Sequence, residues 1–274
     1  METARTVTQA RVLFDALPRP LGFVPTMGAL HAGHLELVRR ARQRSASVAA
    51  SIFVNPMQFG PNEDLAAYPR DEAGDRAKLA AAGVDALFIP EAAAMYAPDF
   101  TSYVDVGPLG QILEGAVRPH HFRGVTTVIA KLLNIVAPDM LFLGQKDAQQ
   151  AAILRKMMAD LNFAVELEIV PTVREPDGLA MSSRNRYLDA QRRADAPTLH
   201  RALVAVADAL ARGESKSDAI AAGAAALSPA AQLDYLELVD PQTFVPLERP
   251  RSSVLILGAA RFGSTRLIDN VLSE

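Results

Sequence analysis

The chain has 274 residues, of which 50% are hydrophobic and 22% are charged, a composition typical of a soluble globular protein and not of a disordered one. At about 150 residues per domain, this length predicts roughly two domains. The 28 basic and 31 acidic residues leave a net charge of −3, without the basic excess of a nucleic-acid-binding protein, so we expect no nucleic-acid partner. Because the chain has no cysteine, disulfides, thiolate metal sites and thiol nucleophiles are excluded.

The sequence contains no apparent membrane segment or targeting signal. No run reaches the ~18 consecutive apolar residues that a membrane-spanning helix needs. The first residues are charged and lack the apolar core and cleavage site of a signal peptide. We therefore expect a cytoplasmic protein with no membrane contact.

The first two-thirds of the chain alternate between short apolar runs and helical patterns. The run at 48–54 is apolar without alternation, which is typical of a parallel strand buried on both faces. The pattern predicts strands at 21–25, 48–54, 86–89, 140–143 and 165–170, and helices around 35–41, 70–82, 125–136 and 148–160. Alternating strands and helices of these lengths predict an α/β fold with a doubly wound parallel, Rossmann-like sheet.

The pattern changes after about residue 189. Alanine-rich helices are predicted at 197–211 and 217–227, and strands at 233–239 and 254–257. These elements predict a smaller C-terminal α+β domain. We place the boundary between residues 183 and 184, so that the two domains are 1–183 and 184–274.

A glycine-containing turn with two histidines follows the first predicted strand and opens a helix. The carboxyl end of a strand is where ligands bind in open α/β sheets, and the start of a helix attracts phosphate. His31 and His34 can both donate to one anion. They could also be surface residues of the turn or two metal ligands, although no cysteine or His-Glu-x-x-His helix completes a metal site. The candidate residues are Met27, Gly28, Ala29, Leu30, His31, Ala32, Gly33 and His34.

Two further loops have residues suited to phosphate. Gly144, Gln145, Lys146 and Asp147 follow the strand at 140–143, with a lysine for phosphate and an aspartate for a metal or a ribose hydroxyl; they could equally be a capped helix start. The second loop contains Met181, Ser182, Ser183 and Arg184, which could close over a triphosphate or form a polar turn. Neither a Walker motif nor Gly-x-Gly-x-x-Gly is present, so nucleotide binding would need another design.

Two loops suit a small substrate. Residues 55–60 (Asn-Pro-Met-Gln-Phe-Gly) follow the second strand, and their amides could recognise a polar molecule beside an apolar wall, or the segment could be an ordinary Pro/Gly loop. Residues 118–124 (Arg-Pro-His-His-Phe-Arg-Gly) form a basic loop that could face an anion or solvent.

Together these motifs resemble the pantothenate synthetase (pantoate–β-alanine ligase) family of the His-x-Gly-His nucleotidyltransferase superfamily. The resemblance extends over nearly the whole chain, and five motifs in the same order are far more specific than any one of them. The matching segments are 25–34, 51–60, 118–125, 144–150 and 173–188, with shorter ones at 234–237 and 259–261.

The resemblance implies a two-step reaction. The carboxylate of pantoate attacks the α-phosphate of ATP to give pantoyl adenylate and pyrophosphate, and the amine of β-alanine then displaces AMP. ATP would be the co-substrate, Mg²⁺ would screen the triphosphate through protein ligands that we do not name, and the protein would be a homodimer. Residues 1–183 would bind nucleotide and pantoate, and 184–274 would form a lid.

The resemblance also assigns roles to residues. The segment from Met27 to His34 would hold ATP, and His34, His31 and Lys146 would be the catalytic group. Gly144 to Asp147 would bind nucleotide, Val173 would touch the adenine, and Met181 to Arg184 would correspond to the mobile Lys-Met-Ser-Lys-Ser loop. Gln58 and Gln150 would hold pantoate.

The chain departs from the family pattern at two positions. His120 stands where many members have glycine, which brings the loop conformation into question, and Gln145 stands where many have glutamate beside the lysine. Two other hypotheses remain: a nucleotidyltransferase that stops after transferring the nucleotide, and a non-catalytic nucleotide sensor. The loop at 55–60 and Gln150 favour the ligase over the first, and the intact His34, Lys146 and 182–184 favour it over the second.

Overall fold

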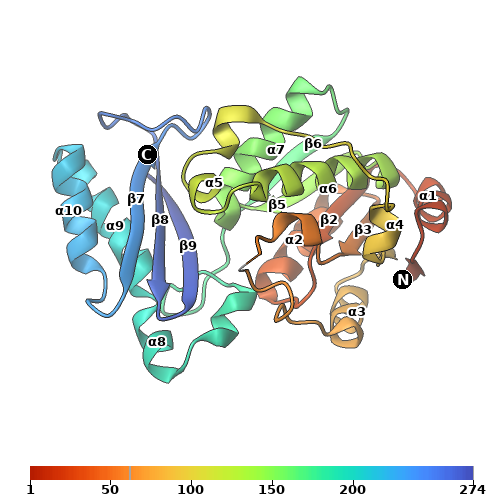
Figure 1. Ribbon diagram of the computed structural model, residues 1–274, viewed down its shortest axis with the longest axis horizontal. Helices are drawn as coiled ribbons and strands as arrows, with labels where there is room; N and C mark the ends of the chain where they lie inside the picture. The colour runs from red at the N-terminus through yellow and green to blue at the C-terminus, as the bar shows by residue number, and fades with distance from the viewer. Residues whose placement is uncertain (62, 274) are drawn as a thin grey trace. The chain divides into compact units, whose positions relative to one another are not determined.

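The computed structural model describes residues 1–61 and 63–273, which form two compact units. The first unit comprises residues 1–144 and 153–170, and the second comprises 145–152 and the chain from 171 onward. Each unit has its own sheet (Figure 1).

The described part of the first unit contains a parallel sheet of six strands. Their order across the sheet is β1 (Glu2–Ala4), β4 (Ala86–Phe88), β3 (Ser47–Ile52), β2 (Leu21–Thr26), β5 (Met140–Gly144) and β6 (Glu166–Val170). The chain order reverses between β2 and β5, which pair in parallel through Phe23 and Leu141. The sheet therefore has the predicted doubly wound arrangement, with its switch point beside β2.

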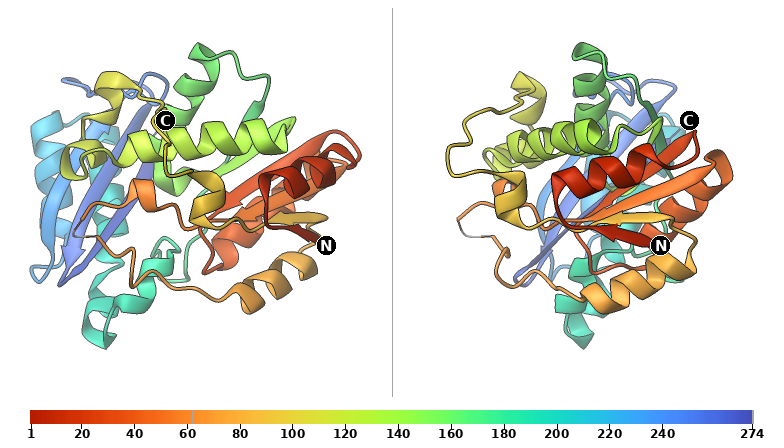
Figure 2. Two further views of the ribbon diagram at one scale, coloured as in Figure 1. Left: turned by 45° about the vertical axis from the view of Figure 1, so that its right-hand side comes forward. Right: turned by 90° about the vertical axis from the view of Figure 1, so that its right-hand side faces the viewer.

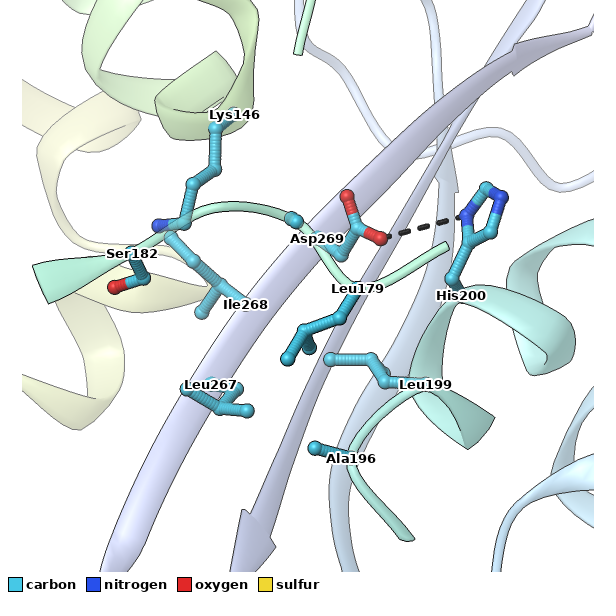
Figure 3. A pocket seen from close by; sticks show the side chains of 10 residues that line it. Lys146, Leu179, Ser182, Ala196, Leu199, His200, Leu267, Ile268 and Asp269 are labelled. Atoms are coloured by element: carbon cyan, nitrogen blue, oxygen red, sulfur yellow. Dashed lines mark ion pairs between the residues drawn. The ribbon is translucent and has the colours of Figure 1, made fainter. Parts of the chain in front are cut away.

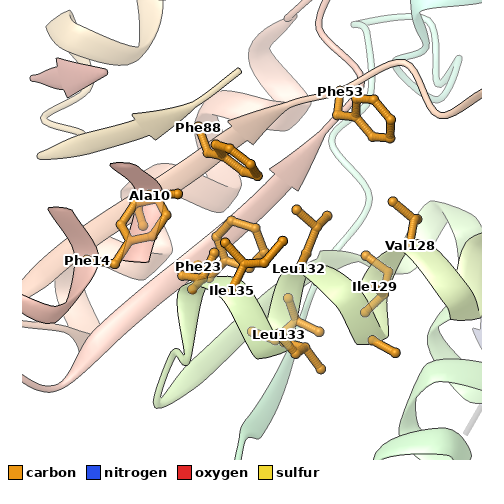
Figure 4. Close-up of a cluster of buried hydrophobic side chains, with 14 of the residues drawn as sticks. Ala10, Phe14, Phe23, Phe53, Phe88, Val128, Ile129, Leu132, Leu133 and Ile135 are labelled. Carbon is orange, nitrogen blue, oxygen red and sulfur yellow. The ribbon is translucent and has the colours of Figure 1, made fainter. Parts of the chain in front are cut away.

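Helices cover both faces of this sheet, as the two views in Figure 2 show for α3 and α6. On one face, α1 (Val7–Asp15), α6 (His121–Val136) and α7 (Ala148–Asp160) contribute to a cluster of buried side chains that includes Phe14, Phe23 and Phe88 (Figure 4). On the other face, α2 (Ala32–Arg44) and α3 (Glu72–Ala81) pack on Phe142 and Leu87. Shorter helical turns of the first unit are α4 (Ala92–Met95), α5 (Glu114–Val117), η1 (Pro56–Gln58) and η2 (Gly107–Gly110), whereas η3 (Gln145–Asp147) belongs to the second unit.

The second unit contains an antiparallel sheet in the order β7 (Gln232–Val239), β8 (Val254–Phe262) and β9 (Thr265–Ser273). Its helices are α8 (Ala190–Asp195), α9 (Thr198–Ala211) and α10 (Lys216–Ala226), preceded by the turn η4 (Ser183–Tyr187). Gly223 allows α10 to approach α9, because a Cβ atom there would lie 2.4 Å from a methyl group of Val206. The predicted α+β character of this region is confirmed.

Some elements differ from the prediction. The strand β1 is too short to show an apolar pattern, and α1 begins at a capping box formed by Thr6 and Gln9. The strand β9 was not predicted, and β8 continues beyond residue 257 to pair with it. The units also divide the chain elsewhere than at residue 183: Asn270 on β9 donates hydrogen bonds to residues 145 and 146, and Arg174 donates to Asp269 on the same strand.

We expect Phe142→Ala to destabilise the protein by about 3–5 kcal/mol, because it leaves a cavity beneath the fully buried ring on β5. Val12→Ala on α1 is the control, since Val12 is 69% exposed and its truncation should change the free energy of unfolding by less than about 0.5 kcal/mol. Denaturant unfolding monitored by circular dichroism measures both changes. Equal effects of the two substitutions would contradict the assignment of Phe142 to the core.

Candidate functional site

The turn between β2 and α2 is held by hydrogen bonds to its backbone. The hydroxyl of Thr26 donates to the carbonyl of Ser51 (2.8 Å) and accepts from the N–H of Gly28 (3.2 Å). Gly28 and Ala29 then adopt left-handed conformations, with φ of 80° and 52°. In this geometry the N–H groups of Ala29 and Leu30 donate to the carboxylate of a residue on α3, at 2.7 and 2.8 Å. That residue is Asp75, so these two backbone donors bind the protein's own carboxylate.

Backbone N–H groups set the tautomers of the two histidines of the turn. The Nδ1 atom of His31 accepts from the N–H of Gly33 (3.2 Å), and the Nδ1 atom of His34 accepts from the N–H of His31 (3.3 Å). The ring centroids are 4.1 Å apart. A neutral imidazole whose Nδ1 accepts carries its proton on Nε2. Both half-buried rings are therefore set up as Nε2–H donors at the start of α2.

Gln58 lies beside this turn. Its Nε2 atom donates to the sulfur of Met27 (3.0 Å), and its Oε1 atom accepts from the amide of Asn55 (3.1 Å). Asn55 is 1% exposed and is itself held by the hydroxyl of Tyr96 (2.8 Å), whose pKa is raised by burial. The side chain of Gln58 is thus oriented by fixed neighbours, and its amide has a second N–H for a ligand.

The close approach of α6 sets the position of η1. A Cβ atom at Gly124 would lie 2.2 Å from the carbonyl oxygen of Met57, so only glycine fits there. The carbonyl of Gly124 accepts from the amide of Asn55 (3.1 Å). The start of α6 and the loop at 55–58 are therefore packed as one piece.

His121 and Arg118 attach the basic loop to the same segment. The carbonyl of Gln58 can only accept, so His121 donates to it from Nδ1 (2.7 Å), while its Nε2 accepts from Arg118 (3.0 Å). Burial and the charge of Arg118 lower the pKa of His121 to about 4. Arg118 also forms a two-point ion pair with Glu63 (2.8 and 2.5 Å). Burial alone would raise the pKa of Glu63, but the hydrogen bonds and charge of Arg118 outweigh it and hold that pKa below its usual value.

His120 occupies a left-handed position, with φ of 67°, immediately before α6. This conformation explains why glycine suits the position, since other residues adopt it at a cost of roughly 1–2 kcal/mol. The side chain of His120 is exposed. The side chain of His120 therefore points no buried group into the loop, and the cost of this substitution is confined to the backbone conformation.

In the second unit, η3 is held by β9. The side chain of Asn270 is 2% exposed and donates to the carbonyls of Gln145 (2.8 Å) and Lys146 (3.0 Å). Its Oδ1 atom accepts from the side chain of Gln145 (3.3 Å). Asn270 therefore fixes the backbone that presents Lys146, whose ammonium lies 3.6 Å from Asp147.

A small pocket in the second unit contains Lys146 and Ser182 in its lining (Figure 3). On β9, the carboxylate of Asp269 lies 3.5 Å from Nδ1 of His200 and forms a two-point ion pair with Arg174 (2.6 and 3.0 Å). Burial would raise the pKa of Asp269, but the nearby His200 ring and the hydrogen bonds and charge of Arg174 lower it, so the carboxylate stays ionised. This charged group lies beneath the loop that leads to Ser182.

The remaining predicted residues of the second unit lie on short turns, except Gln150, which lies on α7. The carbonyl of Val173 accepts from the N–H of Met181 (3.0 Å), which closes a hairpin, and Gly178 turns the chain with φ of 92°. Ser182 caps η4 by accepting from the N–H of Arg184 (3.2 Å). Gln150 is half-buried on α7.

The predicted site residues thus fall into two sets. The first unit brings together Met27 to His34 with Gln58 and also contains Gly144. The second unit contains Gln145 to Asp147, Gln150, Val173 and Met181 to Arg184. Within residues 1–61 and 63–273, no group of three metal-binding side chains occurs and no helix is long and apolar enough to span a membrane.

Sequence reasoning missed the buried residues that hold these turns. Asp75 is 1% exposed, and one sign was available: it lies four residues before Leu79, on the apolar face of a predicted helix. Asp269 and Asn270 are consecutive residues of β9, a strand that was not predicted, so no sequence pattern indicated that they are buried.

The chain matches known proteins over its full length. A family model described as pantoate-beta-alanine ligase matches residues 2–272. The chain is 52% identical over 278 residues to the pantothenate synthetase of Chloroflexus aurantiacus, covering 100% of this chain and 98% of that one. It is also 52% identical over 276 residues to the pantothenate synthetase of Acidiphilium cryptum, covering 99% of each.

Solved structures of similar proteins also match the chain over nearly its whole length. The pantothenate synthetase of Thermus thermophilus superposes with a TM-score of 0.95 at 50% identity, covering 99% of both chains. The pantoate-β-alanine ligase of Francisella tularensis, solved in complex with β-γ ATP and β-alanine, superposes with a TM-score of 0.82 at 32% identity, covering 99% of this chain and 97% of that one.

We expect the stability of the protein to fall as the pH drops from about 6.5 toward 4, because the unfolded ring of His121 has a pKa of about 6.5 and therefore binds its proton more readily than the folded ring. The contribution of neutral His121 to the free energy of unfolding is fully present above pH 6.5. Below that pH the free energy of unfolding falls by at most about 1.4 kcal/mol per pH unit. Urea unfolding at pH 7, 6 and 5 measures it. His121→Asn keeps a donor for Gln58 but does not titrate, so its curve should be flatter, whereas the exposed control His120→Asn should follow the wild type. Parallel curves for wild type and His121→Asn would refute the assignment.

Gln145→Glu should destabilise the second unit by about 1–3 kcal/mol, since a carboxylate cannot donate to Oδ1 of Asn270 and leaves a buried acceptor unpaired. Thermal unfolding followed by near-ultraviolet circular dichroism checks this. The control is Gln191→Glu, which changes an exposed amide that donates to Asp195 (3.3 Å) and should have a much smaller effect. If Gln145→Glu leaves the melting temperature unchanged, the hydrogen bond between Gln145 and Asn270 contributes nothing to stability.

Proposed function

Because the chain belongs to the pantoate-β-alanine ligase family, we propose that it is an ATP-dependent ligase that joins the carboxyl group of pantoate to the amine of β-alanine. The observation that carries this proposal is the paired Nε2–H donors of His31 and His34 at the carboxyl end of β2, in a chain matched by the family from residue 2 to residue 272. The ligands of the Francisella tularensis relative support ATP and β-alanine as substrates.

The reaction needs an activated acid. A carboxylate oxygen of pantoate attacks the α-phosphorus of ATP, a new P–O bond forms, and the bond to pyrophosphate breaks. The β-alanine nitrogen then attacks the carbonyl carbon of pantoyl adenylate, AMP leaves with the electrons of the C–O bond, and the nitrogen loses a proton. Adenylation supplies the leaving group that a free carboxylate lacks, and holding both partners removes much of the entropic barrier.

The two histidines act as hydrogen-bond donors. With Nδ1 of each ring accepting from the backbone, the Nε2–H groups can donate to phosphoryl oxygens without any change of tautomer. Negative charge builds up on those oxygens as the P–O bond to pyrophosphate breaks, and preorganised donors stabilise it. His34 is the principal donor of the pair.

In the second unit, Lys146 supplies the positive charge that offsets the charge of the phosphates, on a backbone fixed by Asn270. The other nucleotide-binding residues are Gly144, Gln145, Asp147, Val173, Met181, Ser182, Ser183 and Arg184.

Gln58 and Gln150 bind pantoate through their side-chain amides. For Gln58, the fixed neighbours Met27 and Asn55 support this role.

Mg²⁺, a homodimer and a cytoplasmic location complete the proposal. Bound Mg²⁺ would neutralise the triphosphate and would take most of its ligands from phosphate oxygens and water, as this ion usually does.

The proposed reaction is tested by isotope transfer. With ATP, β-alanine and pantoate labelled with ¹⁸O in its carboxylate, the purified protein should release AMP that carries one ¹⁸O atom, detected by mass spectrometry. A nucleotidyltransferase that stops after the first step would not form pantothenate. Release of ADP, or of unlabelled AMP, would contradict the acyl adenylate.

His34→Ala should lower the rate of AMP formation by about 10²–10⁴-fold. His34→Gln keeps an N–H near the position of Nε2 and should retain more activity than His34→Asn, which keeps only an acceptor near Nδ1. Steady-state kinetics with His120→Asn as the control measures this order. Equal losses of activity in His34→Gln and His34→Ala would show that His34 does not act as a hydrogen-bond donor.

A further inference from the structure

Asp75 is a buried carboxylate that nothing in the proposed chemistry uses. It lies in the first turns of α3, with 1% of its surface exposed, beneath the turn that carries the histidines. Its two oxygens accept from the N–H groups of Ala29 (2.7 Å) and Leu30 (2.8 Å). A carboxylate with two short backbone hydrogen bonds is among the stronger polar contacts in a protein interior.

A lysine on the same helix completes the contact. Nζ of Lys78 donates to the carbonyl of Leu30 (3.0 Å) and lies 3.6 Å from the carboxylate of Asp75. The turn is therefore held through both its N–H and its C=O groups. The ammonium also supplies a countercharge for a carboxylate that is shielded from water.

These contacts act on a strained part of the backbone. Ala29 has a φ of 52°, which is unfavourable for a residue other than glycine, and the two hydrogen bonds to Asp75 offset that cost. Immediately afterwards, His31 adopts an extended conformation and its N–H reaches Nδ1 of His34. The hydrogen bond that sets the tautomer of His34 therefore starts one residue after the last N–H bound by Asp75.

We infer that Asp75 is a positioning residue for the adenylation step, acting through the turn at 28–30 to keep His31 and His34 as Nε2–H donors. Asp75 uses the amides of Ala29 and Leu30, so within this turn the imidazoles, and not those two amides, carry the interaction with phosphoryl oxygens. This inference rests on the proposed function for its effect on rate. Its effect on the tautomers is independent of that function.

The test is Asp75→Asn, which keeps the shape of the side chain but replaces one accepting oxygen with an NH₂ group that faces a backbone donor. We expect kcat to fall about 10–100-fold and the KM for β-alanine to stay within about 2-fold. In ¹⁵N spectra of the imidazoles, His31 and His34 should lose their predominant Nε2–H form. The matched control is Asp71→Asn on the same helix, because Asp71 caps α3 by accepting from Gly74 (3.0 Å) and asparagine caps equally well.

A merely structural role would lower the melting temperature of Asp75→Asn and leave the tautomers of the folded fraction unchanged. That result, or wild-type kcat in the folded variant, would overturn the inference. If Asp75→Asn does not fold, Lys78→Met decides: it removes the ammonium while keeping an apolar stem, and we expect a 2–10-fold fall in kcat with a partial change of tautomer. Wild-type tautomers in Lys78→Met would then overturn it.

The inference and the proposed function fail in distinguishable ways. If the wild-type protein forms no AMP from ATP, pantoate and β-alanine together, the proposed function fails, whereas the ¹⁵N spectra still report whether Asp75 controls the histidines. If the wild type is active and Asp75→Asn changes neither its tautomers nor its kcat, only the inference fails.

Discussion

The parallel pairing of β2 with β3 is the constraint on which the site in the first unit depends. All strands of a parallel sheet end at the same edge, and the register of Thr26 opposite Ile52 makes β2 and β3 end side by side. The turn with the histidines and the loop with Gln58 must therefore leave the sheet at neighbouring points. The contact between Gln58 and Met27 is the direct consequence of this register.

Three of the side chains to which we assign a function lie on turns held by a polar residue that is almost completely buried. Asn55 orients Gln58, Asp75 holds the turn before His31, and Asn270 holds the backbone of Lys146. A buried polar group is costly unless its hydrogen bonds are satisfied, so such a residue tolerates few positions for the groups it binds. The backbone of each turn is thereby fixed before any ligand arrives, which lowers the reorganisation needed during reaction.

The features that could be predicted depend on residues that lie close together in the chain. Those that could not be predicted depend on contacts between residues far apart in the chain. The strand at 48–54 and the helix at 148–160 could be predicted because their apolar patterns are local. The histidine turn and Lys146 were also predictable, since polar residues that directly follow a strand lie at the edge where ligands bind. By contrast, Asp75 contacts residues 45 and 46 positions away, and Asn270 contacts residues 124 and 125 positions away. No local pattern encodes such pairs, and β9 alternates too little in polarity to be predicted alone.

The neighbours of each histidine determine which of its ring nitrogens carries the proton. At His121 a carbonyl faces Nδ1 and a guanidinium faces Nε2, so the proton sits on Nδ1, the pKa is lowered, and both nitrogens are used within the protein. At His34 a backbone N–H faces Nδ1, so the proton sits on Nε2. The first arrangement makes a structural contact that holds the loop at 55–58, whereas the second places the proton on the opposite ring nitrogen. Residue type alone does not distinguish them; the polarity of the group facing Nδ1 does.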